Sequence, residues 1–194
     1  MKVAYLGPAD SRLLDRFLPD DEVVVTREPL TPEWLDEHEP DFLVSYGYPH
    51  IVPASVLERF PRRAINLHIS LLPWNRGQDP NLWSFLEDTP KGVTIHFMDP
   101  GVDTGDLIAQ RTLELGPDET LRTSHAKCQQ AIEELFSEVW PAVRAGEVEG
   151  RPQVPGGTVH RLAERERYVH LLTEGWDTPV ASLIGAAKRE PDAA

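Results

Sequence analysis

Short apolar runs alternate along the chain with stretches whose apolar residues recur at helical spacing. Six of these runs predict strands, at residues 2–6, 22–26, 41–46, 64–70, 92–98 and 109–115. Strands that alternate with helices are typical of an α/β domain. We therefore expect an open, mostly parallel sheet with flanking helices, and we expect the last run to form an edge strand.

The shorter predicted helices begin at residues that can cap them. Asp10 or Ser11 can cap a short helix after the first strand. Thr31 begins the sequence T-P-E-W, which places a proline in the first turn of a helix. A further helical stretch is expected around residues 79–87, between the fourth and fifth strands.

The clearest helix follows the last strand. Asp118 can cap it, and Pro141 is expected to end or kink it near Trp140. Its apolar face is formed by Leu121, His125, Cys128, Ile132, Leu135, Phe136 and Val139. On this face His125 is expected to belong to the core.

The chain changes character after Gly150. The stretch RPQVPGGT reads as a loop, and a weaker amphipathic pattern follows over residues 160–187. We therefore expect a domain of residues 1–150 and a short C-terminal extension of residues 151–194. The extension would pack on that domain or hold a partner, and its amphipathic pattern makes a homodimer plausible.

Composition narrows the class of protein. Of 194 residues, 40% are hydrophobic and 26% are charged, which is ordinary for a globular chain and excludes wholesale disorder. With 19 Lys and Arg against 32 Asp and Glu, the net charge of −13 disfavours a nucleic-acid partner. A single cysteine, Cys128, excludes an intrachain disulfide and a cysteine-based metal cluster. No apolar run approaches the roughly 18 residues of a membrane span, and the apolar stretch at the start is too short for a signal peptide, so we expect a soluble, cytoplasmic protein.

Polar residues inside an apolar strand point to the chemistry. In the run AINLHIS, the period of two places Asn66 and His68 on the same face, roughly 7 Å apart. A buried face rarely keeps an amide and an imidazole side by side without partners. The next strand leads into the loop DPGVDTGD, whose glycines permit a tight turn around three acids, Asp99, Asp103 and Asp106.

The two features can meet at one edge of the sheet. If the strands are neighbours, an aspartate of this loop reaches His68 at the carboxyl edge, where ligands of open α/β sheets bind. From the spacing alone, a structural histidine remains an alternative.

Residues 64–110, which include INLHISLLPWNRG and GVTIHFMDPGVDTGDLIAQ, resemble the folate-dependent formyltransferase family. The family signature is Asn-x-His, then S-L-L-P, and about thirty residues later an Asp in a V-D-x-G loop. The chain matches it with Asn66, His68, residues 70–73 and Asp103. A weaker resemblance covers about residues 41–168. Within it, LLPWNRGQDPNLWSFLEDTPKGVTIH, QQAIEELF and GGTVH look most like the formylation domain of linear gramicidin synthetase.

The resemblance implies a Rossmann-like, twisted sheet and a formyl transfer. The donor would be N10-formyltetrahydrofolate and the acceptor a primary amine. Asn66 and a protonated His68 would donate hydrogen bonds to the oxyanion of the tetrahedral intermediate. Asp103 would orient the imidazole and help to move the amine proton.

The resemblance also implies two sets of binding residues. Those expected to bind the folate are His50, Ile51, Val52, Ser70, Leu71, Leu72, Pro73, Asp99, Pro100, Gly101 and Val102. Those expected to face the acceptor are Arg76, Gly77 and Asp79. Family members commonly have arginine at the position of His50.

Three other interpretations of the site are weaker. A Ser/His/Asp triad with Ser70 is disfavoured because Ser70 is placed on the same strand as His68 and no G-x-S-x-G motif is present. A metal site of His68, His96 and Asp103 is possible by ligand type, but a supporting role for His96 is favoured, so no metal is expected. A non-catalytic binding module with this fold would be expected to lack at least one of the three signature residues.

Departures from the family pattern reduce the number of possible acceptor substrates. After the first strand, GPADSRLLD offers one glycine and an acid, which is poor for binding the phosphate of glycinamide ribonucleotide. A methionyl-tRNA formyltransferase would have a further C-terminal domain and basic surface, whereas about 45 residues follow Gly150 here. A formyltetrahydrofolate hydrolase usually carries an N-terminal regulatory domain. What remains is a biosynthetic N-formyltransferase for a small amine, whether an amino sugar, an amino acid or a carrier-bound aminoacyl group, and the likeness to the synthetase domain favours the aminoacyl acceptors.

Overall fold

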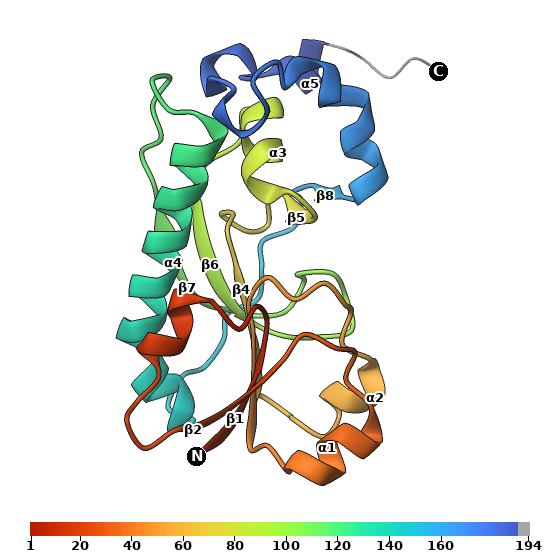
Figure 1. The fold of residues 1–194 in the computed structure, drawn as a ribbon, viewed down its shortest axis with the longest axis vertical. Coiled ribbons are helices and arrows are strands. Elements are labelled where there is room, and N and C mark those ends of the chain that lie inside the picture. The colour runs from red at the N-terminus through yellow and green to blue at the C-terminus, as the bar shows by residue number, and fades with distance from the viewer. Residues whose placement is uncertain (190–194) are drawn as a thin grey trace. The chain divides into compact units, whose positions relative to one another are not determined.

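A computed structural model describes residues 1–189, and its centre is a six-stranded sheet in the order β2-β1-β3-β4-β6-β7 (Figure 1). The strands are β1 Lys2–Leu6, β2 Glu22–Thr26, β3 Phe42–Ser45, β4 Ala64–His68, β6 Gly92–Phe97 and β7 Leu107–Thr112. β1 pairs in parallel with β2 and β3, and β3 pairs in parallel with β4. The predicted open, mostly parallel α/β sheet is confirmed, with β7 at its edge. Three boundaries differ by two or more residues: β4 ends at His68, before Ser70, and β7 begins at Leu107 and ends at Thr112.

A second, two-stranded sheet was not predicted. It pairs β5, Arg76–Gly77, in parallel with β8, Val159–His160. Strands of two residues are too short to show a period of two in the sequence, and their partners lie far apart along the chain.

The helices follow the predicted pattern at most positions. They are α1 Pro32–His38, α2 Ala54–Leu57, α3 Pro80–Leu86, α4 Leu121–Arg144 and α5 Ala186–Arg189, with 3₁₀ segments η1 Arg12–Arg16, η2 Leu162–Leu171, η3 Gly175–Asp177 and η4 Val180–Ser182. Ser11 caps η1 by accepting a hydrogen bond from the Leu13 amide. Thr31 caps α1 by accepting one from the Trp34 amide. Both predicted caps are therefore confirmed.

Helix α4 differs from the prediction at its beginning. Thr120, rather than Asp118, stands before the first helical residue, Leu121. The Thr123 amide donates to Thr120 Oγ1 at 3.2 Å, and the Thr120 amide donates to Thr123 Oγ1 at 2.9 Å. Each threonine therefore satisfies an amide that the helix leaves unpaired, and Asp118 is not needed as the cap.

The end of α4 also differs, because the helix continues through Pro141 to Arg144. A proline removes a single amide donor, so neighbouring contacts can offset its cost. Trp140 is fully buried, and Arg144 forms ion pairs with Asp20 and Asp21, the latter at 2.9 Å. These contacts hold the last turn in place.

The described chain forms two compact units. Unit 1 contains residues 1–68, 95–109 and 133–153, and unit 2 contains residues 69–94, 110–132 and 154–189. Strands β6 and β7 and helix α4 contribute residues to both. The expected division into residues 1–150 and 151–194 stays a prediction.

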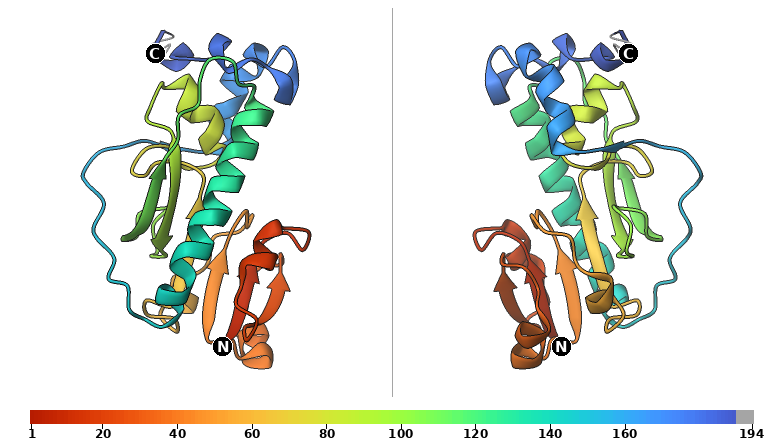
Figure 2. Two further views of the ribbon diagram at one scale, coloured as in Figure 1. Left: turned by 90° about the vertical axis from the view of Figure 1, so that its left-hand side faces the viewer. Right: turned by 90° about the vertical axis from the view of Figure 1, so that its right-hand side faces the viewer.

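In unit 1, successive residues of a strand serve opposite faces of the sheet. Leu43 joins a core cluster with Leu35 of α1 and Val56 of α2. Its neighbour Phe42 packs edge-on against Trp140 of α4, with ring centroids 5.1 Å apart. Helices α1 and α2 therefore cover one face of these strands, and the C-terminal half of α4 covers the other (Figure 2).

In unit 2, residues after Gly150 contribute to the core. Trp83 of α3 stacks on His160, with ring centroids 3.7 Å apart, and packs edge-on against Tyr168. Val180 and Leu183 join the same apolar cluster. The C-terminal segment is thus a structural part of this unit.

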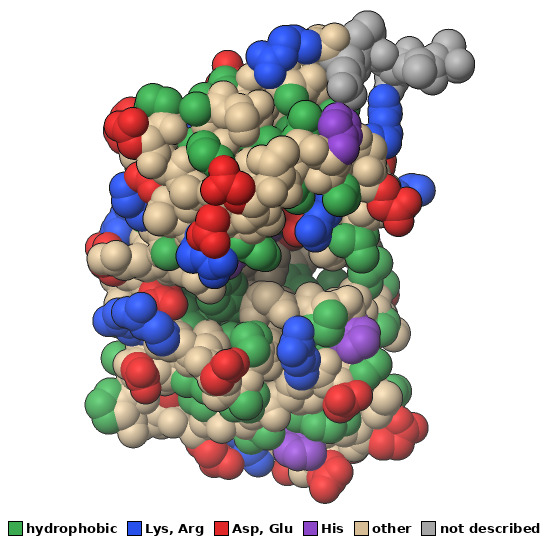
Figure 3. Space-filling view, turned by 45° about the horizontal axis from the view of Figure 1, so that its top comes forward, with side chains coloured by type: hydrophobic (Ala, Val, Ile, Leu, Met, Phe, Trp, Pro, Cys, Tyr) green, Lys and Arg blue, Asp and Glu red, His purple; other side chains and the backbone are tan. Residues whose placement is uncertain are grey.

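Charged side chains of both signs share one face of the protein (Figure 3). On the face shown in Figure 3, Lys and Arg side chains are scattered among acidic ones. Within residues 1–189, no helix combines the length and apolar character needed to cross a bilayer.

Candidate active site

Asn66 and His68 extend from the same side of β4, as the period of two predicts. Asn66 Nδ2 donates to Asp103 Oδ1 at 3.0 Å. His68 Nδ1 lies 3.5 Å from Asp103 Oδ2, and both side chains of this pair are largely buried. The structure therefore brings together the amide, the imidazole and the carboxylate at the carboxyl end of β4.

The loop after β6 is shaped to present Asp103. Asp99 Oδ1 accepts hydrogen bonds from the Gly101 amide at 3.1 Å and from Thr104 Oγ1 at 2.7 Å. Asp103 itself adopts a left-handed conformation with φ of 50°, which aspartate and asparagine tolerate better than most residues. A Cβ on Gly105 would stand 1.9 Å from the Phe97 carbonyl oxygen, so only glycine lets the loop return this close to β6.

Gln153 holds the same loop from outside it. Its Nε2 donates to the carbonyl oxygen of Asp103 at 2.8 Å and to that of Gly105 at 2.9 Å. Sequence reasoning missed this residue, because nothing in the stretch RPQVPGG indicates a contact with residues some 50 positions earlier.

His96 completes the cluster. Its Nδ1 lies 2.7 Å from the Phe97 carbonyl oxygen, which fixes Nδ1 as the donor. In the neutral ring Nε2 is then an acceptor, 3.3 Å from Asn66 Nδ2, and it also lies 3.4 Å from Asp103 Oδ1. In this tautomer Nε2 accepts from the Asn66 amide, which also donates to Asp103, so His96 helps to hold the amide in place. The sequence had left open whether His96 contributes.

The carboxylate of Asp103 thus lies among the imidazoles of His68 and His96 and the amide of Asn66. The carboxylate is largely buried. Such a cluster can hold or move a proton and can donate hydrogen bonds to a developing oxyanion. Within residues 1–189, no group of three or more His, Cys, Asp or Glu side chains is arranged to hold a metal ion.

Of the other residues in unit 1 that were expected to bind the folate, most lie at the surface and one lies in the core. Ile51 is 78% exposed and Val102 44% exposed, so both leave apolar surface uncovered. Pro100 and Gly101 are exposed beside Val102, and His50 is exposed and packs edge-on against Tyr48. Val52 is buried in the core cluster with residues of α1 and α2, so it anchors the segment of residues 50–52 to the core.

The S-L-L-P segment belongs to unit 2. Ser70 is buried, and its hydroxyl donates to the Trp74 carbonyl at 2.7 Å. The Leu72 amide donates to Thr94 Oγ1, so the backbone of the segment is anchored to β6. Ser70 thus closes a turn, which leaves no support for the Ser/His/Asp triad.

Of the residues predicted to face the acceptor substrate, Arg76 and Gly77 have structural roles. Arg76 and Gly77 form β5, and a Cβ on Gly77 would stand 2.3 Å from the His160 carbonyl oxygen. Gly77 is therefore required by the pairing with β8. Asp79 precedes α3, its side chain makes no cap hydrogen bond to the helix, and its carboxylate lies 3.3 Å from Arg165 Nη1.

Comparison with known proteins identifies the family. Residues 25–140, more than half of the chain, match the family model described as formyl transferase. The chain belongs to the formyl transferase family. The predicted family is thereby confirmed, and formyl transferases share the Rossmann-like sheet described above.

Among solved structures, this formyl transferase is similar to the formyltransferase PseJ from Anoxybacillus kamchatkensis, in complex with UDP-4,6-dideoxy-4-formamido-L-AltNAc and tetrahydrofolate. The two chains are 50% identical with a TM-score of 0.93, over 96% of this chain and 100% of the other. A 4-N formyltransferase from Francisella tularensis is 21% identical with a TM-score of 0.71, over 86% of this chain and 78% of the other, and shows the same fold.

Among curated proteins, a methionyl-tRNA formyltransferase of Myxococcus xanthus (strain DK1622) is 34% identical over 153 residues. The match covers 78% of this formyl transferase and 49% of that protein, so the chain spans about half the length of this relative.

Proposed function

We propose that the protein transfers the formyl group of N10-formyltetrahydrofolate to the primary amine of a nucleotide-linked amino sugar. The observation that carries this proposal is the 50% identity, over nearly all of both chains, to a formyltransferase bound to a UDP-linked formamido sugar and tetrahydrofolate. This likeness favours amino sugars over the aminoacyl acceptors that the sequence analysis had favoured.

The cluster around Asp103 supports the chemical step. The amine nitrogen forms a bond to the formyl carbon, and the bond from that carbon to N10 breaks. The amine thereby loses one proton and N10 gains one. His68, held by Asp103 through Nδ1 at 3.5 Å, would donate a hydrogen bond to the oxyanion, and Asp103 would help to remove the amine proton.

When His96 is neutral, the Asn66 amide has two neighbouring acceptors, and it can serve the oxyanion by exchanging one of them. The contact with His96 at 3.3 Å is longer than the bond to Asp103 at 3.0 Å. We therefore propose that the oxyanion replaces His96 as the acceptor, while the bond from Asn66 to Asp103 persists.

Unit 1 also offers surface that suits the donor. The exposed apolar side chains of Ile51 and Val102 match the flat face of a pteridine ring. Asp99, Pro100 and Gly101 would contact it through the loop, as the resemblance implies. When bound, the donor supplies the formyl group, and these residues would orient it.

The decisive experiment mixes the full chain with N10-formyltetrahydrofolate and the UDP-linked 4-amino-4,6-dideoxy sugar whose formamide is bound in the PseJ structure. Mass spectrometry is expected to show the formamide, and without amine no rapid formate release is expected. Formate release at the same rate without amine would instead indicate a hydrolase. Formylation of a carrier-bound aminoacyl group, with none of the sugar, would refute the proposed acceptor.

A pair of histidine variants tests the site in the same assay. His68→Ala is expected to reduce turnover by about 10²–10⁴-fold with the fold intact. The matched control is His38→Ala, because His38 lies on α1 and stacks on Trp34 away from the cluster. Near-normal turnover of His68→Ala would remove His68 from the mechanism.

A further inference from the structure

Unit 2 contains a cavity of about 170 Å³, which we call the unit 2 cavity. Leu82 of α3, Leu121 at the start of α4 and Leu172 after η2 contribute apolar walls. Pockets that hold an entire drug-sized ligand usually measure about 300–1,000 Å³. The unit 2 cavity is therefore suited to a single ring of a larger ligand.

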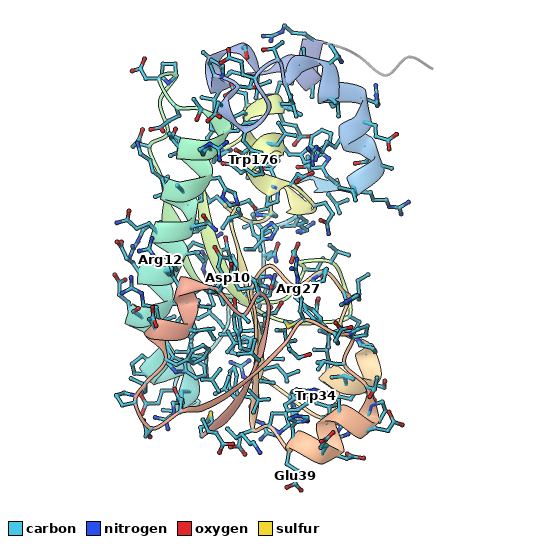
Figure 4. All side chains as sticks on the ribbon, viewed as in Figure 1. Asp10, Arg12, Arg27, Trp34, Glu39 and Trp176 are labelled. Carbon is cyan, nitrogen blue, oxygen red and sulfur yellow. The ribbon has the colours of Figure 1, made fainter. Side chains whose placement is uncertain are left out.

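An indole offers this ring a flat surface. Trp176 of η3 lines the cavity and is half exposed, an unusual state for such a large apolar side chain (Figure 4). His125 meets it edge-on, with ring centroids 5.2 Å apart. Burial lowers the pKa of His125, so its ring is uncharged at pH 7 and adds a neutral wall. The sequence analysis had placed His125 in the core, whereas the side chain is partly exposed at this cavity.

A donor and an acceptor stand side by side on the polar part of the wall. Asp79 and Arg165 both line the cavity, and their side chains approach to 3.3 Å. Asp79 adopts φ of 51°, a left-handed conformation that aspartate tolerates, and its carboxylate does not cap α3. The carboxylate instead lies beside Arg165 on the wall of the cavity.

This arrangement selects a particular ring edge. A carbonyl next to a ring N–H, the lactam edge of uracil, can accept from a guanidinium and donate to a carboxylate. Cytosine instead has an acceptor nitrogen where uracil has the N–H, and this nitrogen would face the Asp79 carboxylate unfavourably.

We infer that the unit 2 cavity binds the uracil base of the acceptor nucleotide, with the ring against Trp176 and its lactam edge on Asp79 and Arg165. This inference rests on the proposed function, because it takes the acceptor to be nucleotide-linked. It gives the segment after Gly150 a role in recognising the substrate. The pterin of a folate has the same lactam edge, but its two fused rings are too large for a cavity that fits a single ring. Binding measurements with UDP and with a folate distinguish the two ligands.

The test measures binding of UDP, CDP and 5-formyltetrahydrofolate to the full chain by calorimetry. Wild type is expected to bind UDP more tightly than CDP. Trp176→Leu is expected to weaken UDP binding by about 5- to 150-fold, the usual loss of base–aromatic stacking, and to leave the affinity for the folate unchanged. Trp34→Leu is the matched control, because Trp34 also packs against a histidine but lies on α1 in unit 1 (Figure 4).

Asp79→Asn provides a second variant whose effect does not depend on the indole. An amide can donate to the ring nitrogen of cytosine, so the preference for UDP over CDP is expected to shrink. Thermal unfolding of each variant confirms that the fold is kept.

Each contrary outcome has a distinct meaning. Equal UDP binding by wild type and Trp176→Leu would overturn the inference and leave the proposed function standing. Weaker folate binding with unchanged UDP binding would assign the cavity to the pterin and overturn the inference as well. Absence of UDP binding to wild type, with the folate still bound, would instead refute a UDP-linked acceptor.

Discussion

The substitution Asp103→Asn isolates the charge of the carboxylate from its shape. Asparagine has nearly the same volume and tolerates the left-handed backbone found at this position, where φ is 50°. It presents one oxygen where aspartate presents two, so it can accept from Asn66 or His68 but not from both. The variant should therefore fold normally and fail in catalysis.

The expected loss follows from the distance between the charges. His68 Nδ1 and Asp103 Oδ2 are 3.5 Å apart, with the two side chains 7% and 13% exposed. At an effective dielectric constant of about 20, two unit charges at this separation attract by about 5 kcal/mol. Asparagine keeps a dipole and retains part of this energy, so we expect the turnover to fall by about 10²–10³-fold.

The assay is single-turnover formyl transfer to the proposed UDP-linked amino sugar, with folate binding and thermal unfolding measured on the same preparations. Asp106→Asn is the matched control, since it neutralises an acid three residues further along the same loop. A folded Asp103→Asn enzyme that keeps more than about a tenth of wild-type turnover would refute the reasoning, because the charge would then contribute less than about 1.4 kcal/mol.

Three further predictions concern the loop, the thiol and metals. Gly105→Ala should lower the free energy of unfolding by about 1–3 kcal/mol in denaturant titrations, because its Cβ would meet the Phe97 carbonyl oxygen at 1.9 Å, whereas Gly116→Ala, with no atom within 4 Å, should not. Burial raises the pKa of Cys128 from an ordinary 9.0 to about 12, so the unfolded chain loses the thiol proton first as the pH rises. Wild type should therefore lose about 2–3 kcal/mol more stability than Cys128→Ala between pH 8 and pH 11, and equal losses would contradict the burial argument. Treatment with EDTA should leave turnover unchanged, and inhibition that a divalent ion reverses would revive a metal site.

Local pattern predicted the strands and the shared face of Asn66 and His68. The period of two in AINLHIS places Asn66 and His68 together because side-chain direction in a strand is a backbone property that needs no tertiary partner. The glycine-bracketed loop that presents Asp103 is likewise readable, because Gly105 must permit a close backbone approach wherever the loop folds back. Helix boundaries were less predictable, since Thr120 and Thr123 cap the start of α4 where the sequence also offered Asp118.

Residues that act through distant contacts left no sequence signal. Gln153 reaches the Asp103 loop from 50 positions away, and β5 pairs with β8 across more than 80 residues. His96 shares one face of β6 with Thr94, but the sequence pattern does not show that this face lies beside Asn66.

By itself, therefore, the sequence determined the sheet, the pair Asn66 and His68, and the family, because each depends on residues close together along the chain. Tertiary structure alone decided that His96 restrains Asn66, and that Asp79, Arg165 and Trp176 line one cavity. The physical reason is that hydrogen bonds and packing act over a few ångströms in space, whatever the separation of their residues along the chain.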